Sequence, residues 1–248
     1  MEKQLREKIF EEKNCVVTGA TGGLGKQIAI ELAQAGCNLF LTGRNEEKLR
    51  EFKKELEKEN QKIKIYYISA DLRKTEKINE LIDAIGKKFS SVDILVNCAG
   101  NFPVNPLSES TIEEFDSCMN LNVRAPFALC KEFSKDMIKN KWGRIVNIAS
   151  SGAYNGLKNT SIYRSSKHAL LGLSRSLSNE LKEFNIRTFS ISPGPMKTQM
   201  GKEIIIRENP NEQFDTFMQP KEIAEFIIFV ISFDDNLFSS EIRLGRMK

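Results

Sequence analysis

Short apolar, β-branched runs alternate with longer helical patterns from Cys15 to the C-terminus, and this alternation constrains the fold more than any other feature. The predicted strands lie near residues 14–18, 37–42, 63–69, 92–98, 143–149, 186–192 and 240–244. The predicted helices lie near residues 24–35, 46–60, 75–89, 111–140, 161–184 and 220–232. Several strands, such as Asp93–Asn97, are apolar at consecutive positions, as a sheet covered on both faces requires. The pattern predicts an α/β fold over residues 1–248: one doubly wound, Rossmann-type domain with about seven parallel strands and helices on both faces.

Composition excludes several classes of function. The 37 basic and 33 acidic residues are interleaved, so no nucleic-acid surface is predicted. The single histidine, His168, is too little for a histidine-based zinc site or a Ser-His-Asp triad, and no metal is predicted. The five cysteines are odd in number and lack a C-x-x-C pair, which predicts reduced thiols in a cytoplasmic protein. A charged N-terminus and short apolar runs predict neither a signal peptide nor a membrane span.

The first predicted strand ends in a glycine-rich turn that runs from Thr18 to Gly25, and a helical pattern follows at once. Glycines let the backbone approach a ligand closely, and the helix N-terminus offers N–H groups to a pyrophosphate. The spacing is G-x-x-x-G-x-G on Gly19, Gly23 and Gly25, which differs from the common G-x-G-x-x-G fingerprint. The turn indicates a dinucleotide site, with a turn that only packs strand against helix as the alternative.

The second predicted strand ends in Gly43 and Arg44, where an enzyme specific for NAD carries an acidic residue. An arginine at this point accommodates the 2′-phosphate of NADP. The sequence therefore favours NADP(H) over NAD(H) as the cofactor.

Two Tyr-x-x-x-Lys pairs are candidates for acid–base chemistry. Tyr154 and Lys158 bracket an Asn-Gly turn signal, so they are predicted to lie in a loop and need not face each other. Tyr163 and Lys167 lie in a helical stretch, where residues four apart share a face. A lysine ammonium beside a phenol lowers its pKa from about 10 toward the working pH. Tyr163 is therefore predicted to exchange a proton with a carbonyl or an alcohol.

With these residues in place, the chain resembles the classical short-chain dehydrogenase/reductases from about Asn14 to Leu244. The other matching motifs are Asp71-Leu72, Asn97-Cys98-Ala99-Gly100, Asn122 with Phe127, Ser150, and Pro193-Gly194 with Thr198. The family serine precedes the active-site tyrosine by thirteen residues, which selects Tyr163, because the same count from Tyr154 reaches Lys141. Three departures are Cys98 in place of a second asparagine, Gly22 where many NADP-using members are basic, and an atypical C-terminus.

The resemblance implies a role for each matching residue. Tyr163 would be the general acid/base, Ser150 would bind the reacting oxygen, Lys167 would bind the nicotinamide ribose, and Asn122 would hold a water for proton relay. The cofactor contacts that the resemblance implies are Gly19, Thr21, Gly23, Leu24, Gly25, Arg44, Asp71, Leu72, Asn97, Ala99, Gly100, Tyr163, Lys167, Pro193, Gly194 and Thr198. His168, which points away around the helix, is given no catalytic role, and Phe127 and Trp142 are interpreted as core or interface residues.

The resemblance implies an NADP(H)-dependent oxidoreductase that interconverts a carbonyl and a secondary alcohol. The 3-oxoacyl-acyl-carrier-protein reductases look most similar, which makes a carrier-bound acyl thioester one substrate class, and a sugar-related or other small carbonyl compound the alternative. A non-catalytic dinucleotide-binding sensor or scaffold is the alternative of another class. A homotetramer or homodimer is implied, through the helices near 111–140 and 161–184. Residues 197–220 are predicted to form a mobile flap over the site or a surface excursion.

Overall fold

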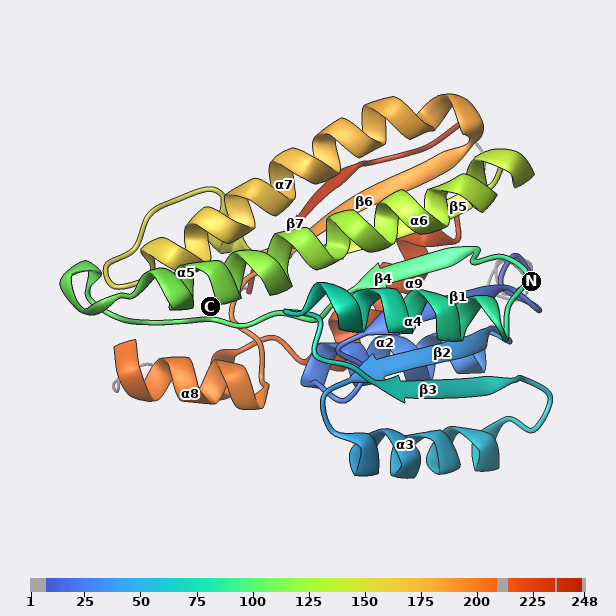
Figure 1. The fold of residues 1–248 in the computed structure, drawn as a ribbon, viewed down its shortest axis with the longest axis horizontal. Helices are drawn as coiled ribbons and strands as arrows, with labels where there is room; N and C mark the ends of the chain where they lie inside the picture. The colour runs from blue at the N-terminus through green and yellow to red at the C-terminus, as the bar shows by residue number, and fades with distance from the viewer. Residues whose placement is uncertain (1–7, 209–213, 235, 247–248) are drawn as a thin grey trace.

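A parallel sheet forms the centre of the molecule (Figure 1). The structure is a computed structural model that describes residues 8–208, 214–234 and 236–246. The seven strands have the order β3-β2-β1-β4-β5-β6-β7, and every neighbouring pair is parallel. They are β1 (Asn14–Thr18), β2 (Asn38–Gly43), β3 (Ile65–Ser69), β4 (Ile94–Asn97), β5 (Gly143–Ile148), β6 (Ile186–Pro193) and β7 (Glu241–Leu244). The predicted fold class is confirmed, and each strand lies within about two residues of its predicted position.

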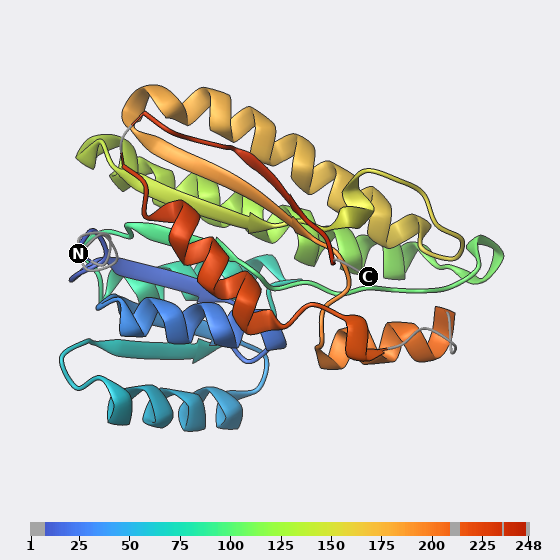
Figure 2. The same cartoon turned by 180° about the vertical axis from the view of Figure 1, so that it is seen from behind.

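Helices cover both faces of the sheet. They are α2 (Gly23–Gln34), α3 (Glu46–Glu59), α4 (Thr75–Gly86), α5 (Ile112–Met119), α6 (Ala125–Asn140), α7 (Ser161–Leu181), α8 (Gln199–Glu208) and α9 (Pro220–Ile231). In Figure 1, α4, α6 and α7 lie in front of the sheet. Figure 2 shows the molecule from the opposite side, and there α2 and α9 lie in front of the sheet. Short helical turns lie at η1 (Leu107–Glu109), η3 (Ser151–Ala153), η4 (Lys182–Phe184) and η5 (Phe214–Thr216).

The core consists of two apolar layers because successive strand residues point to opposite faces. Val17 on β1 and Leu41 on β2 pack in the layer beneath α2 and α9. Their neighbours Val16 and Phe40 pack in the layer beneath α4 and α6. The strand residues of both layers are buried, which explains why the strands are apolar at consecutive positions in the sequence.

Local sequence signals set several helix starts. The Asn45 side chain accepts a hydrogen bond from the Lys48 N–H at 2.9 Å and caps α3. Thr111 and Glu114 form a capping box at the start of α5. In contrast, Gly22 at the start of α2 makes no side-chain cap hydrogen bond, and the first turn of α2 holds no acidic residue. The N-terminus of α2 is therefore built differently from these two.

The helix predicted over 111–140 is divided by a π-helical turn, η2 (Asn120–Arg124), between α5 and α6. The Ala125 N–H donates to the Asn120 carbonyl, one residue farther back than in an α-helix. Pro126 has no N–H, so the carbonyl of Asn122 lacks its usual α-helical donor. Wider turns of this kind are frequent at functional sites.

The segment predicted as a flap or surface excursion contains a helix that the sequence did not indicate. Residues 199–208 form α8, and residues 209–213 of the segment lie outside the described residues. The base of the segment is joined by two backbone hydrogen bonds, from Lys197 N to the Met218 carbonyl at 2.9 Å and from Met218 N to the Pro195 carbonyl at 3.1 Å. Both ends of the excursion are thus held next to the end of β6.

Candidate active site

The predicted site residues gather at the carboxyl edge of the sheet. The chain winds outward from β1 to β3 and then returns to place β4 beside β1. Ligands of open α/β sheets bind in the crevice that such a reversal creates at the carboxyl ends of the strands. The glycine-rich turn follows β1 and the Asn97–Gly100 segment follows β4, so these two motifs border the same crevice.

Thr18 and Gly19 hold these two motifs together. The Thr18 hydroxyl accepts hydrogen bonds from the N–H groups of Cys98 at 3.0 Å and Ala99 at 3.1 Å. Gly19 has a φ of +67°, and a Cβ on it would lie 2.9 Å from the backbone of Ala99. Only glycine meets both the left-handed conformation and this close approach.

The glycine-rich turn fits the pyrophosphate of a dinucleotide. A Cβ on Gly25 would lie 2.3 Å from the Gly19 carbonyl oxygen, so the turn closes tightly against the start of α2. A Cβ on Gly23 would lie 2.5 Å from the methyl carbon of Thr198, which places the segment after β6 over this turn. The uncapped N-terminus of α2 therefore presents its N–H groups at the crevice, where a helix can bind an anion.

Tyr163 lies at the start of α7, next to Ser150 at the end of β5. Tyr163 is only 7% exposed. Gly152 contacts both residues, since a Cβ on it would lie 3.3 Å from the Ser150 hydroxyl and 3.4 Å from the Tyr163 ring. Burial raises the pKa of Tyr163 to about 12, and the hydrogen bond with Ser150 opposes this shift. The structure thus brings the predicted serine and tyrosine together, with the phenol neutral at physiological pH.

Lys167 lies one turn after Tyr163 on α7. Its ammonium donates to the Ile148 carbonyl at 2.7 Å and lies 5.8 Å from the centroid of the Tyr163 ring. Lys167 is not among the groups that shift the pKa of Tyr163 in this structure, where burial dominates. That Lys167 lowers the pKa of Tyr163 stays a prediction. Burial lowers the pKa of Lys167 itself to about 8.

Asn122 is fully buried in the π-helical turn, and its side chain is held on several sides. Its Oδ1 accepts from the Asn101 N–H at 3.0 Å, and its Nδ2 donates to the Asn101 carbonyl at 3.1 Å and to the Ser166 hydroxyl at 2.9 Å. A Cβ on Gly100 would lie 3.2 Å from Asn122 Oδ1 and 3.8 Å from Lys167 Nζ. Asn122, Lys167 and the end of the Asn97–Gly100 motif therefore meet at one point.

The residues predicted to bind the adenosine half lie beyond β2 and β3. Arg44 is exposed, and its charge helps to lower the pKa of Asp71. The larger cause of that lowering is Arg73, whose Nε lies 2.8 Å from Asp71 Oδ1 and whose guanidinium also reaches Oδ2 at 2.6 Å. Thr21 lies against the end of β2, since a Cβ on Gly43 would lie 3.0 Å from its hydroxyl.

Three predicted cofactor residues have side chains that point into the core. The Asn97 side chain donates to Asn147 Oδ1 on the adjacent strand at 2.8 Å, so it links β4 to β5 within the core. Leu24 and Leu72 are buried among apolar side chains, one in each core layer. A direct contact from these three residues to a cofactor would have to come from their backbone.

Pro193 and Gly194 end β6 beside β7, where the Gly194 N–H donates to the Leu244 carbonyl at 2.9 Å. Thr198 caps the first turn of α8 by accepting from the Gly201 N–H at 3.0 Å. Together with its contact to Gly23, this places the Pro193–Thr198 segment next to the glycine-rich turn, as predicted for residues around one cofactor.

The other Tyr-x-x-x-Lys pair, Tyr154 and Lys158, does not form a site. The Tyr154 hydroxyl donates to Glu241 on β7 at 2.8 Å, whereas Lys158 is exposed. His168 is also exposed, with its Nδ1 2.8 Å from the Arg164 carbonyl oxygen. Phe127 is 50% exposed and so is not a core residue, and Trp142 packs beneath the guanidinium of Arg144 near the start of β5.

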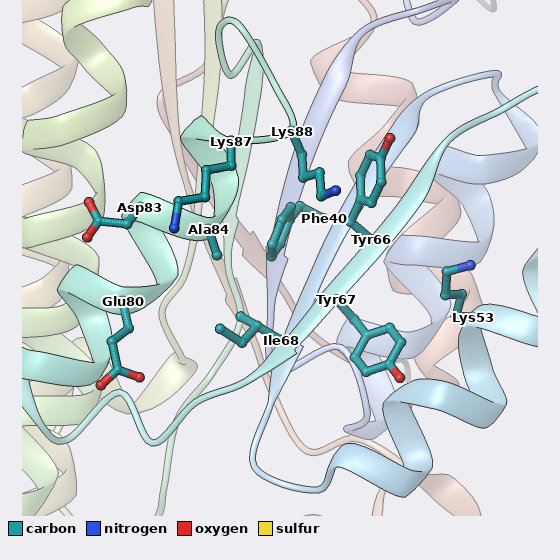
Figure 3. Close-up of a pocket in the computed structure, with 10 residues that line it drawn as sticks. All are labelled: Phe40, Lys53, Tyr66, Tyr67, Ile68, Glu80, Asp83, Ala84, Lys87 and Lys88. Carbon is teal, nitrogen blue, oxygen red and sulfur yellow. The ribbon is translucent and has the colours of Figure 1, made fainter.

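A hollow of about 540 Å³ lies elsewhere, along the outer edge of the sheet between β3 and α4 (Figure 3). It is lined by Phe40, Lys53, Tyr66, Tyr67, Ile68, Glu80, Asp83, Ala84, Lys87 and Lys88, none of which is a predicted site residue. The described part of the chain holds no group of three metal-ligating His, Cys, Asp or Glu side chains. In the same residues no helix has the length and apolar character that crossing a bilayer demands.

Two residues of the site were missed by reasoning from the sequence. Ser166 joins the buried network by donating to the Tyr163 carbonyl at 2.6 Å and accepting from Asn122. Its position between Tyr163 and Lys167 on the same predicted helix could have indicated that Ser166 belongs to the site. Phe102 stacks on the Tyr163 ring with a centroid distance of 3.7 Å, and the sequence carries no signal for this contact between segments 61 residues apart.

The chain belongs to the short chain dehydrogenase family, whose model matches residues 13–209. An oxidoreductase of Staphylococcus aureus strain MRSA252 is 28% identical over 234 residues, which cover 94% of this chain and 97% of the relative. An oxidoreductase of Staphylococcus saprophyticus is 29% identical over 233 residues, with the same coverage of 94% and 97%. The family predicted from the motifs is thus confirmed.

Solved structures of similar fold cover 95% of this chain. L-sorbose reductase from Gluconobacter frateurii, complexed with NADPH and L-sorbose, has a TM-score of 0.87 at 25% identity and is covered over 95% of its length. An alcohol dehydrogenase from Thermococcus sibiricus, complexed with 5-hydroxy-NADP, has a TM-score of 0.84 at 27% identity and is covered over 97%. A metagenomic short-chain oxidoreductase in complex with NADP has a TM-score of 0.80 at 28% identity and is covered over 99%.

Proposed function

We propose that this protein is an NADP(H)-dependent oxidoreductase that interconverts a carbonyl compound and a secondary alcohol, with Tyr163 as acid/base. The observation that carries the proposal is the meeting of Asn122, Ser150, Tyr163 and Lys167 at the carboxyl edge of the sheet, beside a glycine-rich turn with an uncapped helix N-terminus. The NADP and NADPH present in similar structures, together with Arg44 after β2, support NADP(H) as the cofactor.

The chain's own residues account for the proton transfer. A phenol with a pKa of about 12 is protonated at neutral pH, so Tyr163 can donate its proton to the oxygen of a substrate carbonyl. The Ser150 hydroxyl, which bonds the phenol, can bind the same oxygen. A bound nicotinamide supplies the hydride for the carbonyl carbon. Because the proton arrives as the alkoxide develops, little charge accumulates on the substrate oxygen.

Asn122 contributes through its backbone in this proposal. Its side chain is already engaged with Asn101 and Ser166, while Pro126 removes the usual helical donor to its carbonyl. That carbonyl is the group that can hold the water of a proton relay to Lys167 and Tyr163. With a pKa of about 8, the buried amino group of Lys167 can donate a proton as the ammonium and accept one as the neutral amine near neutral pH.

Two substrate classes fit this chemistry, a carrier-bound 3-oxoacyl thioester and a sugar-related or other small carbonyl compound. An assembly of two or four copies through α5, α6 and α7 is part of the proposal. Exposed apolar residues on these helices, Ile112, Phe115 and Phe127, support it.

The test is turnover of the purified protein with NADPH against ketones, 3-oxoacyl thioesters and keto-sugars, followed by loss of NADPH absorbance. The matched variant is Tyr163→Phe, which removes the transferable proton and keeps the ring. We expect kcat to fall by about 10²–10⁴-fold with NADPH binding unchanged. Nucleotide binding without turnover of any substrate would instead support the sensor or scaffold.

A further inference from the structure

The loop between β4 and η1, residues 101–106, is held at both ends and crosses the catalytic side of the molecule (Figure 1). At its start, the backbone N–H and carbonyl of Asn101 both bond the Asn122 side chain, at 3.0 and 3.1 Å. Near its end, the Asn105 N–H donates to the Asn159 carbonyl at 2.9 Å, and the Asn105 side chain donates to Glu114 at 2.8 Å. Pro103 restricts φ between these two anchors, and Pro106 does so at the end of the loop. The loop is therefore stiff.

This stiff loop places an aromatic ring on the proposed acid/base. The Phe102 and Tyr163 rings are stacked, with centroids 3.7 Å apart and planes inclined by 30°. No ligand fits between rings at that distance, so a substrate that presents its carbonyl to the Tyr163 hydroxyl must pass the edge of Phe102. Phe102 thus forms one wall of the approach to the reacting oxygen.

Beyond this wall lies a hollow of about 400 Å³, lined by Asn101, Phe102, Pro103, Glu113, Glu114 and Ser117. Its side-chain acceptors are the carboxylates of Glu113 and Glu114, the Ser117 hydroxyl and the amide oxygen of Asn101. Both Glu114 oxygens already accept, from Asn105 and from the Thr111 N–H, which leaves Asn101 and Glu113 as the acceptors for a ligand. Asn101 Oδ1 is buried and accepts no hydrogen bond from the described residues. A buried acceptor of this kind favours a ligand that brings a donor. The same lining, which holds no lysine or arginine among the described residues, disfavours an anionic ligand.

We propose that Phe102 is a specificity-determining residue and that the hollow beside it receives the hydroxyl groups of a compact, uncharged hydroxy-carbonyl substrate. The flat or C–H-rich face of the substrate packs on Phe102, while its hydroxyls donate to the buried Oδ1 of Asn101 and to the carboxylate of Glu113. An extended acyl thioester carried on a phosphate-bearing arm meets acceptors and negative charge in this hollow. The inference rests on the proposed function and selects the second of its two substrate classes.

The experiment compares three substrates with wild-type protein and NADPH: 1,3-dihydroxyacetone, pentan-3-one, in which a methyl group replaces each hydroxyl, and a 3-oxoacyl phosphopantetheine thioester. We expect kcat/KM for the hydroxy ketone to exceed that for pentan-3-one at least about tenfold, because an analogue without hydroxyls leaves the buried Asn101 Oδ1 unpaired. The thioester is expected to be the poorest substrate. Phe102→Ala should lower the hydroxy-ketone preference about tenfold, mainly through KM, and Phe102→Leu should lie between the two.

The exposed ring of Phe226 on α9 lies outside the hollow and outside the proposed subunit contact, so Phe226→Ala is the matched control and should keep the wild-type preference. NADPH binding, measured for each variant, identifies any protein that has lost its fold. If Phe102→Ala and Phe102→Leu keep the wild-type substrate ratio, or if the wild type prefers the thioester, the inference is overturned. If the wild type reduces none of a broad panel of carbonyl compounds, the proposed function fails before this test begins.

Discussion

The two halves of the carboxyl edge of the sheet differ in the groups that line them, which are backbone groups in one half and side chains in the other. After β1 and β2, the edge consists of backbone brought close by glycines, with an exposed arginine, Arg44. After β4 and β5, it consists of buried polar side chains, and Asn122, Tyr163 and Lys167 are each at most 7% exposed. The first half can bind through N–H groups that any sequence has, whereas the second depends on particular side chains.

The halves also differ in how they lower stability. In the turn after β1 the demand is conformational, because Gly19 must adopt a left-handed backbone conformation. The catalytic half buries ionisable groups: burial lowers the pKa of Lys167 to about 8 and raises that of Tyr163 to about 12. Burying the charged form of Lys167 costs free energy, so the catalytic half is where activity and stability conflict.

One side chain joins the two halves. Arg124, in the π-helical turn two residues after Asn122, donates to the carbonyl of Arg73. Arg73 in turn holds Asp71 through its guanidinium. The loop predicted to bind adenine is thereby tied to the catalytic turn, and the two halves can still be disturbed separately by the following variants.

The largest effect on stability is expected at Gly19. Gly19→Ala combines a left-handed alanine with a Cβ 2.9 Å from the Ala99 backbone, and should lower the free energy of unfolding by about 2–4 kcal/mol and abolish NADPH binding. The matched control is Gly172→Ala on α7, where a Cβ meets nothing within 4 Å, and which should be stabilising by up to about 1 kcal/mol. Denaturant unfolding measures both. Equal effects of the two variants would contradict the backbone account of the first half.

The next effect concerns the buried charge of the second half. Lys167 keeps its proton up to about pH 10.4 when unfolded, and in the folded protein its pKa is about 8. The unfolded state therefore binds more protons between these values, so stability should rise by roughly 2 kcal/mol from pH 7 to pH 9.5. Lys167→Met should lack this rise, as judged by denaturant unfolding at the two pH values.

Lys158→Met, which removes an exposed lysine from the loop before α7, is the control and should keep the wild-type pH dependence. A rise that persists unchanged in Lys167→Met would show that Lys167 is not the group responsible.

The smallest effect is expected at the exposed charge of the first half. Arg44→Asp replaces attraction to a 2′-phosphate by repulsion, and should shift the kcat/KM ratio from NADPH toward NADH by about 10–100-fold. Stability should change little because Arg44 is exposed. Arg50→Asp makes the same charge change on the exposed face of α3 and should leave the cofactor ratio within about twofold. An equal shift in both variants would indicate that Arg44 acts through the overall electrostatic field of the protein and makes no specific contact with the 2′-phosphate.

Much of the fold and part of the site could be predicted because the relevant signals are local. Periodicity located all seven strands, since a strand or helix is determined mostly by neighbouring residues. The Tyr163–Lys167 spacing placed both side chains on one helix face for the same reason. The helix over 199–208 was missed because its segment contains polar residues and weak periodicity, and the base of the segment is held by contacts to Pro195 and Met218.

The sequence by itself determined the doubly wound parallel fold, the glycine-rich turn and the identity of the candidate acid/base, because each depends on residues that lie close together in the chain. Only the tertiary structure decided that Lys167 bonds the Ile148 carbonyl, that Asn97 turns into the sheet, and that Phe102 covers Tyr163. These three contacts join segments far apart in sequence. Their geometry depends on how β4, β5 and α7 pack together, which no local pattern records.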